Sequence, residues 1–374
     1  MRIVHCSDVH LDRAFVALDP DAARQRRLDL RSAFERIVAL AEERRADVIT
    51  VGGDLWEDEH VTGDTRQFVA HVAGRARVPV LIAPGNHDPL LHGGHYTRTA
   101  WPSHVRIFDR ETPHEARFGD VSVWGVAWLS GHLDLGWLQD FRVPADGRMH
   151  LLLLHGSAAQ HWGGATPGEQ AQYAPFDPED VARCGFRVCL AGHYHGGSYA
   201  SGVVYPGSPE PLGWGETGRH TAAVVDAGLD ALSVELVDTG RLSYLERAVD
   251  CEGAQSGAEV GERLAGALDD ARAETTCVRV SLTGQVGVEC EIDVEALAAA
   301  HRGRYAAIDV RDATEPAFDL DAMAARSDAA GHFVRALRRL ADDATGPRER
   351  EKLRIALEAG LRALDGRRQV ARVD

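Results

Sequence analysis

Short polar motifs follow apolar runs throughout the first 200 residues of this chain. The runs are rich in Val, Ile and Leu, and each predicts a buried strand. Because the ends of neighbouring strands meet at one edge of a sheet, we expect these polar residues to gather there. The motifs are Ser7-Asp8-Val9-His10, Gly53-Asp54, Gly85-Asn86-His87-Asp88, His155-Gly156 and Gly192-His193-Tyr194-His195.

The segments between these motifs predict an α/β (α+β) fold. A helical pattern from Arg27 to Arg45 precedes a β-branched strand, Asp47 to Val51, and a second helix near 65–74 precedes a strand at 79–84. Beyond about residue 104, strands dominate. This order favours two β-sheets that pack as a sandwich and are flanked by helices. The later predicted strands are Val121 to Leu129, Met149 to Leu154, Arg187 to Ala191, Val203 to Tyr205, Thr221 to Val225 and Leu232 to Leu236.

Three regions are expected: a main domain over 1–240, a small α/β domain over 241–314, and a helical tail over 315–374. The small domain has a β-α-β-α-β order. The tail is predicted to be two amphipathic helices split at Gly346-Pro347, which either pack on the protein's own core or serve a partner.

Composition limits the possible partners. The 374 residues carry a net charge of −16 with a single lysine, Lys352, which disfavours broad attraction to nucleic acid. The chain has no apolar stretch long enough to span a membrane and no signal-peptide pattern, so a cytoplasmic location is expected. The six cysteines show no paired spacing and are expected to be reduced and buried.

The chemical types in the motifs indicate metal ions. Carboxylate, amide and imidazole ligands without thiolates suit a pair of hydrolytic divalent ions, and Asp54 is the candidate bridge because its motif lies between the other two N-terminal ones. Two ions lower the pKa of a water held between them and neutralise charge on a phosphate, so the pattern predicts phosphoester hydrolysis. The predicted metal ligands are Asp8, His10, Asp54, Asn86, His155, His193 and His195.

Each residue also has an ordinary structural interpretation. A lone histidine such as His155 is more often a core or surface residue, Asp8 fits a helix N-cap, and Gly85-Asn86 fits a turn. All five motifs in order after strands are hard to reconcile with coincidence. His92 and His95 lie in a glycine-rich loop, where contact with substrate is the less favoured alternative.

Taken in order, D-x-H, GD, GNHD, H and GHxH resemble the calcineurin-like metallophosphoesterase signature. The resemblance implies that His87 contacts the scissile phosphate and assists the leaving oxygen, and that Asp88 orients the imidazole of His87 and raises its pKa. It also implies two ligand sets sharing one aspartate: Asp8, His10, Asp54 and His195 for one ion, and Asp54, Asn86, His155 and His193 for the other.

Further segments are similar to SbcD-like and YhaO-type bacterial DNA-repair exonucleases, namely Met1 to Asp12, Arg26 to Arg31, and Val204 to Glu210 followed by Gly215 to Gly218. This resemblance implies a manganese-dependent DNA exonuclease or endonuclease, with Mg²⁺ as the alternative ion. It further implies a homodimer whose tail docks on an SbcC-like coiled-coil SMC ATPase. One departure, Leu55-Trp56-Glu57-Asp58 where many of these nucleases have GD-x-F-D or GD-x-F-H, leaves the role of Glu57 open.

Two alternatives remain. The same core also hosts cyclic-nucleotide phosphodiesterases and phosphatases that act on small molecules. A protein that mainly regulates an ATPase, with weak catalysis, is the other. The chain lacks the GDxxDRG arginine of Ser/Thr protein phosphatases, which disfavours that class.

Overall fold

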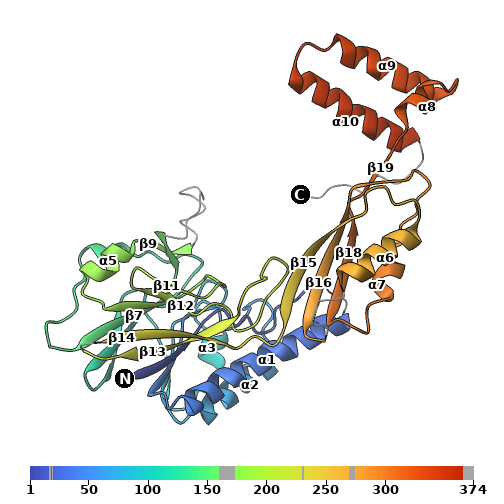
Figure 1. Cartoon of the computed structure of the whole chain (residues 1–374). Coiled ribbons are helices and arrows are strands. Elements are labelled where there is room, and N and C mark those ends of the chain that lie inside the picture. Colours follow the sequence, from blue (N-terminus) through green and yellow to red (C-terminus); the bar gives the residue numbers. More distant parts are fainter. Residues whose placement is uncertain (17, 19, 160–172, 230, 269–273, 365–374) are drawn as a thin grey trace. The chain divides into compact units, whose positions relative to one another are not determined.

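The structure is a computed structural model that describes residues 1–16, 18, 20–159, 173–229, 231–268 and 274–364. The chain divides into two compact units (Figure 1). The larger unit comprises Met1–Arg247, Ala271–Arg279 and Ala298–Asp309, and the smaller one comprises Ala248–Asp270, Val280–Leu297 and Val310–Asp374.

The first sheet of the larger unit carries the three N-terminal motifs. Its strands from edge to edge are β14 (Leu232–Asp238), β13 (Thr221–Ala227), β1 (Arg2–Cys6), β2 (Val48–Val51), β3 (Val80–Ile82) and β4 (Val105–Ile107). Strands β1 to β4 pair in parallel. Strand β13 pairs antiparallel with β1, and β14 pairs antiparallel with β13. The carboxyl ends of β1, β2 and β3 therefore share one edge.

The second sheet carries the other two motifs. Its strands in order are β11 (Ser198–Ala200), β12 (Val203–Tyr205), β10 (Val188–Gly192), β7 (Met149–His155), β6 (Val121–Gly125) and β5 (His114–Phe118). Strands β7 and β10 are parallel neighbours whose register sets His155 opposite Gly192. The His155 and Gly192–His195 motifs thus leave adjacent strand ends.

The two sheets pack face to face, which confirms the predicted β-sandwich. Buried side chains of the first sheet, such as Ile3 and Leu81, meet Leu151 and Leu190 of the second in one apolar core. Burying these side chains removes apolar surface from water and contributes roughly 1.5–3 kcal/mol for each large one.

Buried His5 joins the two sheets at the edge that carries the motifs. Its Nε2 bonds to the carbonyl of Ala191 at 3.2 Å, and its Nδ1 bonds to Thr50 Oγ1 at 3.0 Å. Burial lowers the pKa of His5 to about 4, so the ring is neutral at pH 7, with Nε2 donating and Nδ1 accepting.

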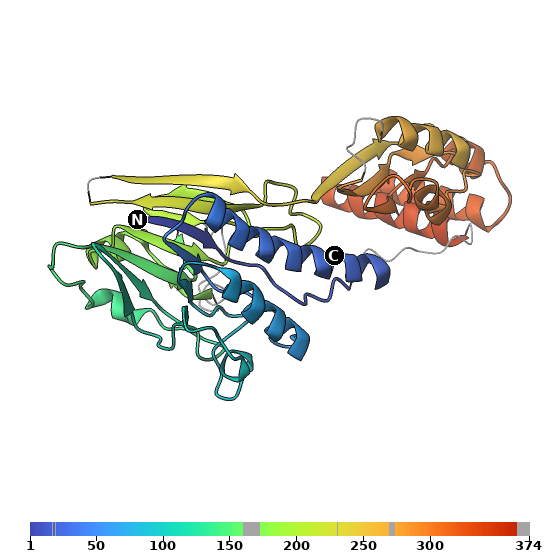
Figure 2. The same cartoon turned by 90° about the horizontal axis from the view of Figure 1, so that it is seen from below.

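Two long helices lie along the outer face of the first sheet (Figure 2), and the short α5 (Pro178–Arg183) and η1 (Gly136–Gln139) pack against the second. The helices α1 (Pro20–Glu43) and α2 (Gly63–Arg75) pack their apolar stripes on the first sheet. Helix α1 begins earlier than the predicted Arg27, because the fixed φ of Pro20 suits a first helical turn. The remaining small elements are α3 (His95–Arg98) and the pair of β8 (Ser157–Ala158) and β9 (Pro175–Phe176).

The chain beyond Arg241 has the predicted β-α-β-α-β order followed by helices. Leu340, Ile355 and Leu364 on the last two helices remain 50–53% exposed. The elements are β15 (Ser243–Asp250), α6 (Gly257–Ala267), β16 (Thr276–Thr283), β17 (Gln285–Val286), α7 (Val294–Ala299), β18 (Ala307–Asp312), β19 (Glu315–Pro316), α8 (Leu320–Ala324), α9 (Ala329–Asp343) and α10 (Pro347–Leu364). The predicted break at Gly346-Pro347 is confirmed, whereas the short α8 was not expected.

All six cysteines are buried, and none of them forms a disulfide in the described structure. Among the described residues, no helix combines the length and apolar character needed to cross a membrane.

Candidate metal centre and active site

The backbone at the shared strand edge is strained. Asp8, His10, Asp54 and His193 have positive φ angles of 53°, 48°, 52° and 115°, a region that residues other than glycine seldom adopt. Backbone hydrogen bonds between the loops after β1 and β2 hold this conformation: Asp8 N donates to Gly53 O and His10 N donates to Asp54 O, both at 3.0 Å. Such strain persists where the surrounding structure fixes it, typically at functional sites.

Asp54 lies between residues predicted to bind different ions. Its Oδ2 is 3.6 Å from Nε2 of His10 and 3.3 Å from Nε2 of His155. Asp8 lies beside both groups, since its carboxylate clusters with His10 and His195 and also with Asp54 and His155. The position of the Asp54 carboxylate between His10 and His155 is the one that a bridge between two ions requires.

Within the part of the chain that the structure describes, Nε2 of His10 and Oδ1 of Asn86 are buried without a hydrogen-bond partner. Nε2 of His155 is also buried, and the Asp54 carboxylate lies 3.3 Å from it. A buried polar atom without a partner costs about 1–3 kcal/mol. Nitrogen and oxygen lone pairs that converge on carboxylates are suitable ligands for a divalent ion. The residues present therefore fit a metal centre.

The outward nitrogens of these histidines are already bonded. Nδ1 of His10 lies 2.9 Å from Glu57 Oε1, Nδ1 of His155 lies 2.7 Å from the carbonyl of Gly52, and Nδ1 of His195 lies 2.8 Å from Glu216 Oε1. With Nδ1 donating, each ring turns Nε2 towards the cluster, where that nitrogen can bind a metal once it carries no proton, a common arrangement around protein-bound metals.

The charges of the cluster are coupled. Burial opposes a charge on His155, but the carboxylate of Asp54 and the charge of Asp8 raise the pKa of His155 to about 9. The same contact with His155 holds the pKa of Asp54 well below its usual range despite burial. In the absence of a cation, the cluster therefore retains a proton on His155 near pH 7.

His193 lies at the side of this cluster. Its ring centroid is 5.5 Å from that of His155 and 4.9 Å from that of Tyr173, and its backbone N–H donates to Asp8 at 3.1 Å. Burial, and then the charge of His155, lower the pKa of His193 to about 4, which leaves the ring neutral and able to bind a cation.

His87 is oriented by Glu57. Its Nδ1 lies 2.8 Å from Glu57 Oε2, and its side chain is 43% exposed. The hydrogen bond to Glu57 raises the pKa of His87, against the effect of burial. Although burial favours a neutral carboxyl, hydrogen bonds from His10 and His87 hold the pKa of Glu57 well below its usual range.

The prediction that Asp88 orients the His87 ring is wrong. Asp88 is fully buried and accepts hydrogen bonds from Tyr96 Oη at 2.6 Å and from three backbone N–H groups. Those groups are Gly85 N at 2.6 Å, Leu55 N at 2.7 Å and Asp54 N at 3.0 Å. Asp88 thus ties the loop after β2 to the loop after β3.

Glu57 and Glu216 were missed as partners of the histidines. Glu57 lies in the segment that departs from the nuclease pattern, and Glu216 lies in the Gly215 to Gly218 segment, to which the resemblance assigned no role. No local signal assigns them, because each acts on a histidine that lies 21 or more positions away in sequence. Only the short distances between these carboxylates and the histidine rings in the folded chain identify them.

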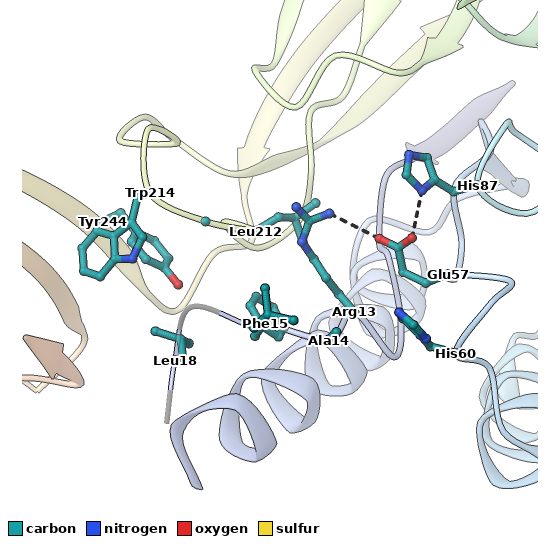
Figure 3. Close-up of a pocket in the computed structure, with 12 residues that line it drawn as sticks. Arg13, Ala14, Phe15, Leu18, Glu57, His60, His87, Leu212, Trp214 and Tyr244 are labelled. Atoms are coloured by element: carbon teal, nitrogen blue, oxygen red, sulfur yellow. Dashed lines mark hydrogen bonds and ion pairs between the residues drawn. The ribbon is translucent and has the colours of Figure 1, made fainter. Parts of the chain in front are cut away.

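A cavity of about 470 Å³ opens beside His87 and Glu57 in the larger unit (Figure 3). Its other lining residues are Arg13, Ala14, Phe15, Val16, Leu18, His60, Leu212, Gly213, Trp214 and Tyr244. His92 and His95 do not line it. Nε2 of His95 is bonded to the carbonyl of Asp58 at 3.1 Å, which agrees with the ordinary structural interpretation of that residue.

Comparison with known proteins finds two similar sequences and one solved structure with limited similarity. Uncharacterized metallophosphoesterase YhaO of Bacillus subtilis (strain 168) is 26% identical over 302 residues, which are 76% of this chain and 72% of that protein. DNA double-strand break repair protein Mre11 of Methanopyrus kandleri is 25% identical over 236 residues, which are 57% of this chain and 49% of that protein. Among solved structures, TT1561 of Thermus thermophilus has 18% identity and a TM-score of 0.40, covering 64% of this chain and 98% of that one.

Residues 1–197 match the calcineurin-like phosphoesterase family. The matched segment includes all five motifs and more than half of the chain. Since the two-sheet fold and the clustered ligands agree with this match, the chain belongs to the calcineurin-like phosphoesterase family.

Proposed function

We propose that this protein is a manganese-dependent phosphodiesterase that cuts DNA. The observation that carries the hydrolytic part is the position of Asp54 Oδ2 between the buried Nε2 atoms of His10 and His155, at 3.6 and 3.3 Å. The likeness to Mre11 and the resemblance to DNA-repair exonucleases support DNA as the substrate.

Two ligand sets around Asp54 would hold the ions. The first set is Asp8, His10, Asp54 and His195, and the second is Asp54, Asn86, His155 and His193. The family uses two divalent ions; when bound, they supply charge neutralisation at the phosphate and lower the pKa of a coordinated water. Mixed oxygen and imidazole ligands are compatible with manganese.

His87 would supply the proton for the leaving sugar oxygen. Because its Nδ1 is engaged by Glu57, its Nε2 is the nitrogen available to substrate. The raised pKa keeps more of the ring protonated near pH 7, as a general acid requires. Glu57 therefore acts as a positioning residue that sets both the orientation and the charge of this ring.

The test is hydrolysis of linear single-stranded and double-stranded DNA and of cyclic nucleotides, with manganese or magnesium. Asp54→Ala should abolish cleavage, and His87→Ala should reduce it by about 10²–10⁴-fold. His71→Ala, on the exposed side of α2, is the matched control. Cleavage that survives Asp54→Ala would contradict the two-metal site, and turnover of cyclic nucleotides without cleavage of DNA would contradict the substrate.

We also propose that the α9–α10 pair binds a coiled-coil SMC ATPase and that the chain forms a homodimer. The exposed apolar side chains of Leu340 and Ile355 support a docking role for the helices. Co-elution of the two proteins, lost in Leu340→Asp and Ile355→Asp, tests the docking, and light scattering tests the dimer. Unchanged co-elution of the variants would contradict the docking site.

A further inference from the structure

One end of the cavity beside His87 is aromatic. Phe15, Trp214 and Tyr244 line it, and the ring centroids of Trp214 and Tyr244 are 4.8 Å apart in an edge-to-face arrangement of 88°. Figure 3 shows these two rings at one end of the cavity, with Glu57 and His87 at the other. The aromatic residues come from sequence positions some 200 residues apart.

Buried and partly buried arginines hold the aromatic rings in place. The guanidinium carbon of Arg279 lies 4.3 Å from the centroid of Trp214, and that of Arg26 lies 5.4 Å from the centroid of Phe15. Arg26 is itself fixed, since it bonds to Asp29 at 2.9 Å and to a backbone carbonyl. The aromatic end is therefore formed without a ligand, which lowers the ordering cost of binding.

The polar end belongs to the phosphoester site. His87 and Glu57 line the same cavity, and Nη1 of Arg13, whose side chain is 36% exposed, lies 3.3 Å from Glu57 Oε1. The chain has a net charge of −16, but the positive charge of the Arg13 guanidinium attracts an anion such as a phosphate to this end of the cavity. An occupant that fits both ends has a phosphate at one side and a flat ring at the other.

We propose that this cavity binds the base of the nucleotide next to the scissile phosphate by stacking on Trp214, while the buried rings of Tyr244 and Phe15 form the apolar wall around it. The inference rests on the proposed function and names the form of the substrate. A volume of about 470 Å³ is within the range of small-molecule sites. Stacking tolerates any base, so little sequence preference is expected.

A site that takes up one unpaired base favours single-stranded DNA over duplex DNA. A base inside a duplex is paired and stacked on its neighbours, so it must leave the helix before it can enter the cavity. Single-stranded DNA and frayed ends meet this condition at lower cost. The protein should therefore cut single-stranded DNA faster than an equal length of blunt duplex.

The first experiment uses the full chain with Mn²⁺ and a single-stranded oligonucleotide whose cut site is mapped. Copies of the oligonucleotide carry one abasic residue on either side of that bond. Removing the base should lower kcat/KM by about 5- to 150-fold, as expected for the loss of one stacked base. Trp214→Ala should lower cleavage of the intact strand by a similar factor and leave the abasic strand unaffected. Trp214→Phe should retain most of the preference, and Tyr199→Ala, an exposed aromatic outside the cavity, should retain all of it.

The second experiment separates this proposal from the proposed function. Calorimetry with Mn²⁺ compares binding of deoxyadenosine monophosphate with that of 2-deoxyribose 5-phosphate, and wild type should bind the nucleotide about 5- to 150-fold more tightly. A protein that cuts no DNA yet shows this difference would contradict the nuclease function alone. Equal affinities, together with equal cleavage of intact and abasic strands, would overturn the stacking site while the nuclease function stands.

Discussion

Glu57 Oε2 accepts a hydrogen bond from Nδ1 of His87 at 2.8 Å. The other oxygen of the same carboxylate lies 2.9 Å from Nδ1 of His10. One acidic side chain thus orients both the predicted general acid and a predicted metal ligand. This contact connects the proposed proton donor to the candidate metal centre, and it makes Glu57 the first residue to test.

Glu57→Gln should separate charge from geometry, because the amide retains the size of the side chain and loses its charge. Since Glu57 raises the pKa of His87, its loss should lower that pKa and shift the alkaline limb of the pH–rate profile to lower pH. Activity should fall by about 10–100-fold. Exposed Glu59→Gln is the control, and an unshifted alkaline limb in Glu57→Gln would contradict the role.

Asp88→Asn should affect folding more than proton transfer. The new amide would place an N–H group against at least one of the donors that Asp88 now accepts, such as Leu55 N at 2.7 Å or Gly85 N at 2.6 Å. The free energy of unfolding should fall by about 1–3 kcal/mol. Chemical denaturation measures this loss. A shift of the alkaline limb as large as that of Glu57→Gln would instead restore Asp88 as the partner of His87.

Metal binding should strengthen as pH rises from 6 towards 9. His155, whose pKa is raised to about 9, must lose its proton to coordinate a cation, so binding releases a proton below that pH. Mn²⁺ at 100 times its dissociation constant should add about 2.7 kcal/mol to the free energy of unfolding. Calorimetry in buffers of different ionisation enthalpy detects the released proton. Asp54→Ala should remove the effect, and affinity that does not change with pH would count against the assignment.

Buried His5 should make the protein sensitive to mild acid. Below pH 6.5 the unfolded chain protonates this histidine, whereas the folded chain holds it neutral until about pH 4. The free energy of unfolding should therefore fall as pH drops from 6.5 to 4, by up to about 3 kcal/mol from this group. Denaturation at several pH values should give a flatter dependence for His5→Gln than for wild type. Parallel curves would show that His5 does not contribute.

Gly85→Ala should disrupt the metal centre. A Cβ at this position would meet the Asp54 carboxylate and lie 2.7 Å from the backbone nitrogen of Asp54. The candidate bridging residue would have to move, so Mn²⁺ affinity should fall by tenfold or more. Gly131→Ala is the matched control, because a Cβ there meets no atom within 4 Å. Equal Mn²⁺ affinity in both variants would show that Asp54 does not need its present position.

The sequence by itself determined the strands that end at the motifs, their polar ends and the sandwich that they form, whereas the outer strands β4, β5 and β11 were not predicted. An apolar run such as that before Asp54 or His155 is a local pattern, and a buried strand is the structure that satisfies it. The β-α-β-α-β order after Arg241 and the break at Gly346-Pro347 follow from equally local signals.

Only the tertiary structure decided which side chains surround the predicted ligands. His87 bonds to Glu57 and not to the predicted Asp88, and this depends on how two loops fold against each other. The hydrogen bond between His195 and Glu216 depends on a third loop. The aromatic cavity joins Phe15 to Trp214 in the same way. Periodicity within a segment carries no information on these contacts, because they depend on loop conformations and on packing between distant segments.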